Sequence, residues 1–291
     1  MLSKKRYLPL IILVLFAVSL FGCTQTTPTP TTPENKDIIL ATTTSTQDSG
    51  LLDVLIPDFE KKTGYKVKTV AVGTGAALTM GEKGEADVLL VHAPADEKKL
   101  VDSGVGINYQ LVMHNDFIIV GPENDPAGIK GTKSAAEALK KISEKGSIFV
   151  SRGDNSGTHK AELAIWKAAG ITPAKGSASY QETGAGMGQT LTVASQKEGY
   201  TLTDRATYLA QQKNIKLNIM VEGEKSLLNI YHVMQVNPEK FPKVNAAGAK
   251  AFVEYMIAAD TQKLISQFGV DKYGQALFFA DAGKNEADLG K

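Results

Sequence analysis

The sequence predicts an α/β fold with two lobes, each a mainly parallel β-sheet flanked by helices, joined by two strands that cross between the lobes. Three observations support this prediction. Short apolar runs alternate with amphipathic ones, two extended runs are much longer than the others, and several runs end in glycine, serine or threonine. With 291 residues, of which 43% are hydrophobic and 22% charged, the chain can form one large domain or two modest ones.

The N-terminus has the pattern of an export signal. Residues 1–7 carry three positive charges, residues 8–22 form an apolar run that is short for a membrane-spanning helix, and Cys23, the only cysteine, follows directly. The sequence LFGC, Leu20–Cys23, resembles a bacterial lipobox, although Phe21 replaces the usual smaller residue. We expect a signal peptide that ends in a lipidated cysteine, which would hold the exported protein on the outer face of the cytoplasmic membrane, in the periplasm or at the cell surface. The alternatives are an uncleaved anchor helix or a secretory signal with an incidental cysteine.

Residues 24–36 form a threonine- and proline-rich tract without apolar residues. Such a tract cannot offset its ordering entropy by burial, and its prolines keep it extended. We interpret it as a linker, with the folded part beginning near Asp37.

The folded part begins with alternating strands and helices. Residues 49–64 place apolar side chains at helical spacing, with Pro57 inside the pattern, where it can kink the helix, and Gly64 as a stop. Around this helix the sequence predicts extended runs over residues 37–45, 65–72 and 86–93, and helices over residues 73–84 and 95–104. This repetition is typical of an α/β fold.

Two long extended runs, residues 109–120 and 229–238, are the predicted crossing strands. Between these two runs the sequence predicts helices over residues 134–146, 159–170 and 205–212 and strands over residues 147–151 and 200–204. After the second run it predicts a strongly helical segment over residues 245–269. We therefore expect lobe 1 to comprise residues 37–118 and 231–291, and lobe 2 to comprise residues 119–230.

Four segments share one design, in which a strand leads through a turn rich in glycine, serine or threonine into a helix. They are residues 40–50, 72–78, 150–162 and 182–191, the last with a weaker leading strand. Such turns present unpaired backbone N–H groups and hydroxyls at a helix N-terminus, where anions bind. One such turn is most often only a helix cap, but four of them predict an anion site, because they gather at the carboxyl ends of the strands.

The segment SRGDNSGTHKAE, Ser151–Glu162, contains the strongest candidate, Arg152, whose planar guanidinium suits an oxyanion. The alternative is a structural ion pair with Asp154 or another carboxylate, and both roles are compatible. Asp154 either turns away to hold Arg152 or to cap the helix, or it accepts a proton from a ligand such as hydrogen phosphate. His159 lies in the first turn of the following helix, where a neutral hydrogen-bonding role is expected.

Other functions lack their motifs. A net charge of +1 gives no basic excess for binding nucleic acid. His92, His114 and His232 have no metal-binding spacing, so we interpret them as packing or capping residues and expect no metal, no cofactor and no catalytic residue. The sequence GAGMG, residues 184–188, lacks the preceding hydrophobic strand and the glycine spacing of a dinucleotide site.

Taken together, the motifs resemble the tungstate-binding component of bacterial and archaeal ABC importers. The resemblance extends from about Ile38 to the C-terminus and rests on ATTTSTQDSGLLDVLIPDFEKKTG, VAVGTGAAL, ADVLLVHAPADEKKLVDSG, FVSRGDNSGTHKAEL and GAGMGQTL. It implies a type II periplasmic-binding-protein fold, and a monomer that captures an oxyanion between its lobes and delivers it to a membrane permease driven by an ATPase. The ligand-binding residues that the resemblance implies are Thr43, Thr44, Ser45, Thr74, Gly75, Arg152, Ser156, Thr158, Gly188, Gln189 and Thr190.

Three alternatives stay open from the sequence. Molybdate or phosphate is the alternative ligand within the same class of binding protein. A secreted phosphoryl- or sulfuryl-transfer enzyme could use Arg152, Asp154 and His159, but no nucleophile is paired with a recognisable base. A signalling or adhesion protein could use the Arg-Gly-Asp tripeptide, Arg152–Asp154, but a strand-to-helix turn would bury these side chains.

Overall fold

The computed structural model describes residues 35–289. The predicted signal peptide, its Cys23 and most of the predicted linker lie outside these residues. The contacts described below belong to one unit, which spans residues 33–291. Between residues 35 and 289, no helix combines the length and the apolar character that crossing a membrane requires.

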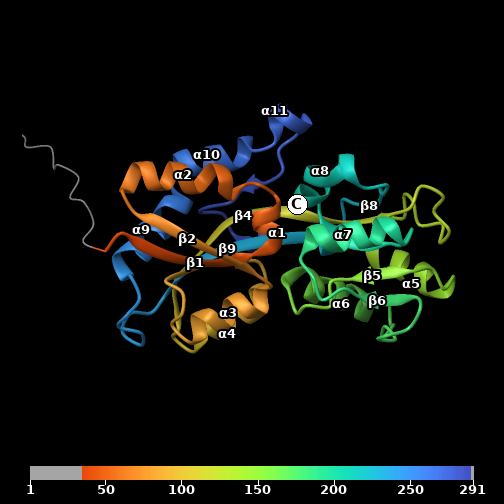
Figure 1. Ribbon diagram of the computed structural model, residues 1–291, viewed down its shortest axis with the longest axis horizontal. Coiled ribbons are helices and arrows are strands. Elements are labelled where there is room, and N and C mark those ends of the chain that lie inside the picture. The colour runs from red at the N-terminus through yellow and green to blue at the C-terminus, as the bar shows by residue number, and fades with distance from the viewer. Residues whose placement is uncertain (1–34, 290–291) are drawn as a thin grey trace, which may run out of the picture. The chain divides into compact units, whose positions relative to one another are not determined.

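Strands and helices alternate along most of the chain, as predicted (Figure 1). The strands are β1 (Asp37–Thr43), β2 (Lys66–Val72), β3 (Val88–Val91), β4 (Gly106–Gly121), β5 (Phe149–Ser151), β6 (Tyr180–Glu182), β7 (Thr201–Asp204), β8 (Asn218–Val221), β9 (Leu228–Val236) and β10 (Phe279–Ala280). The helices are α1 (Thr44–Asp48), α2 (Leu52–Thr63), α3 (Thr74–Glu82), α4 (Pro94–Asp102), α5 (Ala135–Glu144), α6 (Gly157–Ala168), α7 (Met187–Gln196), α8 (Arg205–Gln211), α9 (Ala246–Ile257), α10 (Ala259–Gln267) and α11 (Val270–Tyr273).

Strands from both ends of the folded chain form one part of the main sheet. β1 pairs in parallel with β2 and β3, and the antiparallel pairs β3–β9, β9–β4 and β4–β10 extend the sheet. β3 is buried along its whole length. Val88 and Leu90 lie in a hydrophobic cluster with side chains of α2 and α9, whereas Leu89 and Val91 lie in a cluster with side chains of α3 and α4. The sheet is therefore covered by helices on both faces, as expected for an α/β fold.

The middle of the chain forms a second group of strands and helices. β7 and β8 pair antiparallel with the second part of β4, and β5 pairs in parallel with β6. Two further hydrophobic clusters are drawn from residues 117–227. Alternate residues of β4 again divide between them, since Ile119 lies in one cluster and Ile118 and Val120 lie in the other.

The long strands β4 and β9 connect these two groups (Figure 1). β4 has 16 residues, and it pairs with β9 between Gly106 and Asp116 and with β7 between Phe117 and Val120. The two long strands predicted from the sequence are thus present, but all their pairings are antiparallel. The predicted parallel pairing is found among β1, β2 and β3 and between β5 and β6, because helices connect these strands.

One predicted helix is divided in the structure. The helical segment over residues 245–269 consists of two helices, α9 and α10, because the backbone at Ala258 is extended, with φ −66° and ψ 144°. The weaker strand predicted before the fourth glycine-rich turn is β6, and only Tyr180 of its three residues is buried. Pro57 lies within α2, which continues to Thr63 and ends before the left-handed Gly64.

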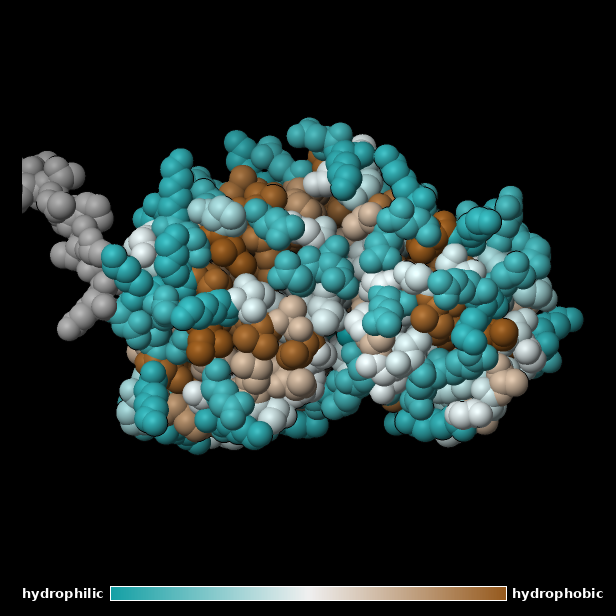
Figure 2. Space-filling model, viewed as in Figure 1, coloured by the Kyte–Doolittle hydropathy of each residue, from teal (hydrophilic) through white to brown (hydrophobic). Residues whose placement is uncertain are grey.

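Hydrophilic side chains cover most of the face seen in Figure 2, and apolar residues show between them over α2 and β2 and in smaller groups near α7. Of the large apolar side chains within residues 35–289, Val54, Val270 and Phe279 are exposed. The buried polar residues are therefore the more informative feature, and many of them lie in the turns at the ends of strands.

Candidate functional site

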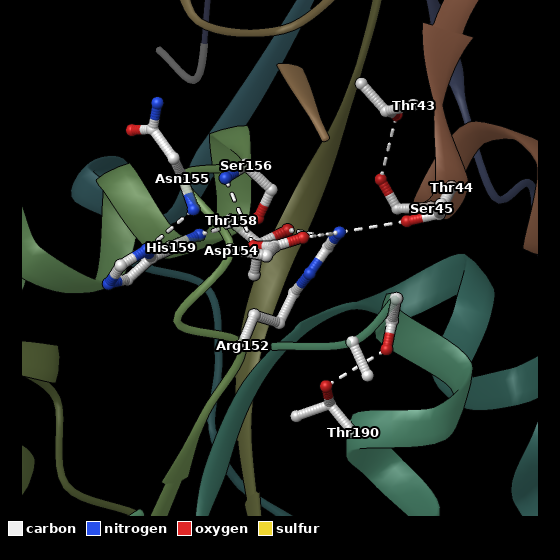
Figure 3. Close-up of polar contacts among 12 residues, drawn as sticks. Thr43, Thr44, Ser45, Arg152, Asp154, Asn155, Ser156, Thr158, His159 and Thr190 are labelled. Carbon is white, nitrogen blue, oxygen red and sulfur yellow. Dashed lines mark hydrogen bonds and ion pairs between the residues drawn. The ribbon is translucent and has the colours of Figure 1, made fainter. Parts of the chain in front are cut away.

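The turns that follow β1 and β5 meet at one place (Figure 3), and the turn that follows β2 contacts the second of them. In the turn after β5, Arg152 Nη2 donates to Thr44 Oγ1, 2.9 Å away at the start of α1. The backbone N–H of Gly157, the first residue of α6, donates to Oγ1 of Thr74, the first residue of α3, at 3.0 Å. Segments separated by 108 and 83 residues in the sequence are thus in direct contact.

Two glycines allow these turns to approach each other. A Cβ atom at Gly75 would lie 2.5 Å from Nδ2 of Asn155, and a Cβ atom at Gly157 would lie 2.7 Å from the ring of His92. The Asn155 side chain is exposed and can move, whereas His92 is buried. The absence of a side chain therefore matters more at Gly157 than at Gly75.

Arg152 is a buried cation that is paired with Asp154. Its side chain is 1% exposed, and its Nη2 lies 2.6 Å from Asp154 Oδ2. Its Nη1 lies 3.5 Å from Thr158 Oγ1, which is a long hydrogen bond, and Nε has no hydrogen-bond partner within the described part of the chain. Buried guanidinium groups normally satisfy their N–H donors, so Arg152 retains donor capacity for a further acceptor.

Asp154 holds Arg152 in place. One carboxylate oxygen accepts from the guanidinium, and the other, Oδ1, accepts from the backbone N–H of Ser156 at 3.1 Å. Ser156 in turn caps α6, since its Oγ accepts from the N–H of His159 at 3.2 Å. Of the two roles that the sequence left open for Asp154, this geometry corresponds to the first, in which the carboxylate orients the arginine.

The turn after β1 gathers hydroxyls around a buried histidine. Thr43 Oγ1 lies 3.1 Å from Ser45 Oγ and 3.0 Å from His92 Nε2, and Ser45 Oγ lies 3.3 Å from the same nitrogen. Burial, followed by the positive charge of Arg152, lowers the pKa of His92 to about 3, so its ring is neutral at physiological pH. His92, interpreted from the sequence as a packing or capping residue, thus contacts two of the predicted ligand residues.

His159 is held in the neutral role that its position predicted. Its Nδ1 accepts from the backbone N–H of Asn155 at 3.0 Å, and burial lowers the pKa of the imidazole. An imidazole that accepts at Nδ1 carries its proton at Nε2, which lies 4.0 Å from Glu182 Oε1.

The two histidines of the long strands pair with carboxylates. His114 Nδ1 in β4 lies 2.5 Å from Asp281 Oδ2, and His232 Nδ1 in β9 lies 2.9 Å from Glu97 Oε2. Across residues 35–289, no group of three or more His, Cys, Asp or Glu side chains is arranged to hold a metal ion.

The turn before α7 contributes backbone more than side chains. The N–H of Gly188 donates to Asp48 Oδ2 in α1 at 3.2 Å, which brings this fourth turn to the other three. Thr190 Oγ1 donates to the carbonyl of Gly186 at 3.0 Å, within its own turn. Gln189 is exposed. Of the three residues predicted here, only Gly188 therefore forms a hydrogen bond to another of the converging turns within the described part of the chain.

Two buried groups beside these turns were not predicted. The hydroxyl of Tyr231 in β9 contacts the hydroxyls of Ser45 and Thr46. Asp204, the last residue of β7, is fully buried at the start of α8. The segment TLTDRATYL has the same strand-to-helix design as the four turns, but it lacks the glycines by which those turns were recognised.

Comparison with known proteins gives relatives that cover most of the chain. A family profile described as a PBP superfamily domain matches residues 28–260. The tungstate-binding protein TupA of Peptoclostridium acidaminophilum is 49% identical over 287 residues, which cover 96% of this chain and 100% of the relative. The crystal structure of the tungstate ABC transporter from Geobacter sulfurreducens is 50% identical, covers 80% of this chain and 99% of its own, and has a TM-score of 0.74. The tungstate-binding protein TupA from Desulfovibrio alaskensis G20 is 48% identical, covers 84% of this chain and 99% of its own, and has a TM-score of 0.69.

The fold and the profile match define a solute-binding protein of the PBP superfamily. Within that superfamily, the identity of nearly one half over almost the whole chain shows that the protein belongs to the TupA family of tungstate-binding proteins. This is a family of binding proteins rather than of enzymes. The α/β fold and the family resemblance predicted from the sequence are thereby confirmed.

Proposed function

We propose that this protein is the extracytoplasmic solute-binding protein of an ABC importer and that it captures a tetrahedral oxyanion, most strongly tungstate. The observation that carries the proposal is the convergence of the turns after β1, β2 and β5 around Arg152, a buried guanidinium that retains an unpartnered Nε among the described residues. The names of the relatives support the same ligand.

The chemistry of these turns favours an anion that carries no proton. Tungstate and molybdate are tetrahedral dianions at neutral pH, so they need donors and no acceptor. The proposed ligand residues are Thr43, Thr44, Ser45, Thr74, Gly75, Arg152, Ser156, Thr158, Gly188, Gln189 and Thr190, which offer hydroxyls, N–H groups and one cation. The side chain of Gln189 is exposed, so this residue would contribute its backbone N–H and not its amide group. Hydrogen phosphate would need an acceptor for its proton, and both oxygens of Asp154, the carboxylate that pairs with Arg152, are already engaged within the turn. Among the described buried carboxylates, only Oδ2 of Asp204 has no hydrogen-bond partner, and it lies outside the four turns.

Two lobes of a type II binding protein are part of the proposal. Lobe 1 comprises residues 37–118 and 231–291, lobe 2 comprises residues 119–230, and β4 and β9 join them. The hydrophobic clusters support this division, because two of them draw on residues 117–227 and the other two draw almost entirely on the remaining elements.

In this arrangement the contacts of Arg152 with Thr44 and of Gly157 with Thr74 cross between the lobes. They would form when the lobes close over the oxyanion. Closure removes water, and a lower local dielectric strengthens the charge-assisted hydrogen bonds. The closed form would then be recognised by the permease as the loaded protein.

We also propose that the protein is exported and anchored to the membrane by a lipid. Residues 1–23 would direct export, a lipid on Cys23 would anchor the monomer to the outer face of the cytoplasmic membrane, and residues 24–36 would link the anchor to the lobes. Such a tether keeps the binding protein close to its permease.

Calorimetric titration of the purified protein with tungstate, molybdate, sulfate and phosphate tests the proposed ligand. We expect tungstate to bind most tightly, molybdate next because its charge and shape are the same, sulfate weakly because it is smaller, and phosphate not measurably. Binding of phosphate without binding of tungstate would contradict the proposal. Turnover of a phosphoester would instead favour the transferase alternative.

A further inference from the structure

Asp204 is a buried carboxylate with one free oxygen. It ends β7 and caps α8, where its Oδ1 accepts from the backbone N–H of Thr207 at 2.8 Å. The side chain is 0% exposed, and Oδ2 has no hydrogen-bond partner within residues 35–289. Helix capping accounts for the burial of Oδ1, but no contact among the described residues accounts for the burial of Oδ2.

Asp204 lies beside the converging turns. Oγ1 of Thr207, the residue whose N–H Asp204 caps, lies 3.4 Å from the carbonyl oxygen of Ser45, so the start of α8 touches α1. Tyr231, whose hydroxyl contacts Ser45 and Thr46, also experiences the charge of Asp204, which helps to raise the pKa of the phenol. The free carboxylate oxygen is therefore buried close to the hydroxyls proposed to hold the oxyanion.

Two other charges act on Asp204. The positive charge of Arg152 favours its ionised form, and the negative charge of Asp48 disfavours it. In β9 its charge acts on Tyr231, whose phenol burial keeps uncharged. Its neighbour in the sequence, Arg205, is engaged elsewhere, with Nη2 2.5 Å from Asp116 Oδ2 and 2.7 Å from Glu222 Oε2.

These surroundings leave Asp204 close to its titration point. Burial is the largest cause and raises the pKa of Asp204 to about 6, although the N–H and hydroxyl of Thr207 and the charge of Arg152 act in the opposite direction. Above pH 7 the carboxylate is therefore ionised in the protein without ligand, and a modest change in nearby charge is enough to protonate it.

We propose that Asp204 takes up a proton when the oxyanion binds, so that capture of the dianion is coupled to protonation of this one carboxylate. The inference rests on the proposed function, since it requires a dianion beside Arg152. The dianion brings two negative charges into the buried region and draws on the same guanidinium charge that keeps Asp204 ionised. Both effects favour the neutral carboxyl, and the proton comes from solvent to the free Oδ2.

The sign of the pH dependence follows from this coupling. Below the pKa of Asp204 in the free protein, the carboxyl is neutral in both states and the affinity does not depend on pH through this group. Above it, each binding event must take up a proton, so the affinity falls by about tenfold per pH unit until the pKa of the complex is reached. The affinity for tungstate is therefore higher at pH 7 than at pH 9.

The substitution Asp204→Asn separates the charge from the cap. Asparagine is isosteric with aspartate and caps helices equally well, so its Oδ1 can still accept from Thr207. The amide carries no charge at any pH. We expect Asp204→Asn to bind tungstate with an affinity that is independent of pH between 7 and 9 and that exceeds the affinity of the unmodified protein at pH 9.

The matched control is Asp48→Asn. Asp48 is a second carboxylate near Arg152, but it is exposed and its Oδ2 already accepts from the N–H of Gly188. We expect this variant to keep the pH dependence. Glu162 is the other buried carboxyl that could account for proton uptake, because burial raises its pKa to about 7. It accepts hydrogen bonds from Ser151 and Tyr180. Measuring proton uptake in Asp204→Asn distinguishes Asp204 from Glu162.

The experiment is calorimetric titration of the purified protein and both variants with sodium tungstate at pH 7, 8 and 9, in Tris and in HEPES. The two buffers differ in ionisation enthalpy, so the difference in observed heat counts the protons taken up. We expect uptake of about one proton at pH 8 by the unmodified protein and by Asp48→Asn, and none by Asp204→Asn. If Asp204→Asn does not fold, Asp204→Ser keeps a capping oxygen without the charge, and proton uptake by the unmodified protein is measured in either case.

Tungstate binding without proton uptake would overturn this inference and leave the proposed function intact. Uptake that persists in Asp204→Asn, or that is lost only in Asp48→Asn, would also overturn it. Failure of the unmodified protein to bind tungstate at any of these pH values would instead contradict the proposed function.

Discussion

The turn after β5 and the turn after β1 contact each other, yet they are built from different chemistry. The first contains the ion pair of Arg152 with Asp154, in which the side chains are 1% and 15% exposed. The second contains the hydroxyls of Thr43 and Ser45 around a neutral His92. One turn therefore supplies a fixed charge, and the other supplies hydroxyls whose protons can rotate to suit the ligand.

We infer that the charged turn mainly determines how strongly an anion binds, and that the hydroxyl turn mainly determines which size and shape of anion is preferred. The guanidinium is paired with Asp154 within its own turn, which lowers the cost of keeping it buried. A ligand can still use the donors that Asp154 leaves free, Nε above all. The hydroxyl turn carries no charge of its own, so its contribution depends on distance and direction. Removing the fixed charge should therefore cost more affinity than any change that leaves it in place. Three substitutions test this expectation, at the charge itself, at the contact between the turns and in the turn before α7.

Arg152→Ala should have the largest effect. It removes the only cation that contacts Thr44 in the described contacts and leaves Asp154 without its partner. We expect the affinity for tungstate to fall by at least about 100-fold, or about 3 kcal/mol, as measured by calorimetry. Arg152→Lys keeps the charge but loses the planar guanidinium, so its affinity for tungstate should lie between those of the unmodified protein and Arg152→Ala. An unchanged affinity in Arg152→Ala with an unchanged unfolding temperature would show that this charge does not bind the ligand.

Gly157→Ala should have an intermediate effect, because it tests whether the turns must touch. The added Cβ would lie 2.7 Å from the ring of His92 and 3.0 Å from its carbonyl oxygen, and a buried residue cannot easily move. We expect a loss of about 1–3 kcal/mol in binding free energy, measured by the same titration. Gly75→Ala is the milder comparison, since its Cβ meets the exposed and movable side chain of Asn155 at 2.5 Å and the backbone oxygen of that residue at 3.2 Å. Because Gly75 is itself a proposed ligand residue, we expect this variant to lose less affinity than Gly157→Ala but not to be neutral. Equal affinities for both variants and the unmodified protein would show that close approach of these turns is not required.

Sequence reasoning predicted the parts of this site better than their assembly. A strand, a polar turn and a helix are local features, so the turns containing Thr43, Thr74 and Arg152 could be recognised from neighbouring residues alone. The same holds for the neutral state of His159, which follows from its place in the first turn of α6. Which turns touch depends on the antiparallel pairing of β4 with β9 and β7, which no local pattern encodes.

Three residues near the candidate site could not be recognised from local sequence patterns. His92 follows β3, Asp204 ends β7 and Tyr231 lies in β9. They approach the converging turns because β9 pairs with β3 and with β4, and β4 also pairs with β7. In the sequence each has the pattern of an ordinary packing or capping residue, since His92 follows an apolar run, Asp204 stands between a predicted strand and a predicted helix, and Tyr231 lies in a long extended run. Their burial and their contacts distinguish them, and both require the folded structure.

Gln189→Ala should have the smallest effect of the three substitutions, and it tests whether the turn before α7 contributes a side chain to binding. Gln189 was predicted as a ligand residue by resemblance alone, and its side chain is exposed in the turn before α7. We expect its removal to change the affinity for tungstate by less than about twofold, as for most exposed substitutions. Thr190→Val is the control within the same turn, since it removes the bond from Oγ1 to the carbonyl of Gly186 and should lower the unfolding temperature more than the affinity. A tenfold loss of affinity in Gln189→Ala would show that this side chain turns inward to the ligand, so that the fourth turn binds through a side-chain amide where the turn after β1 binds through hydroxyls.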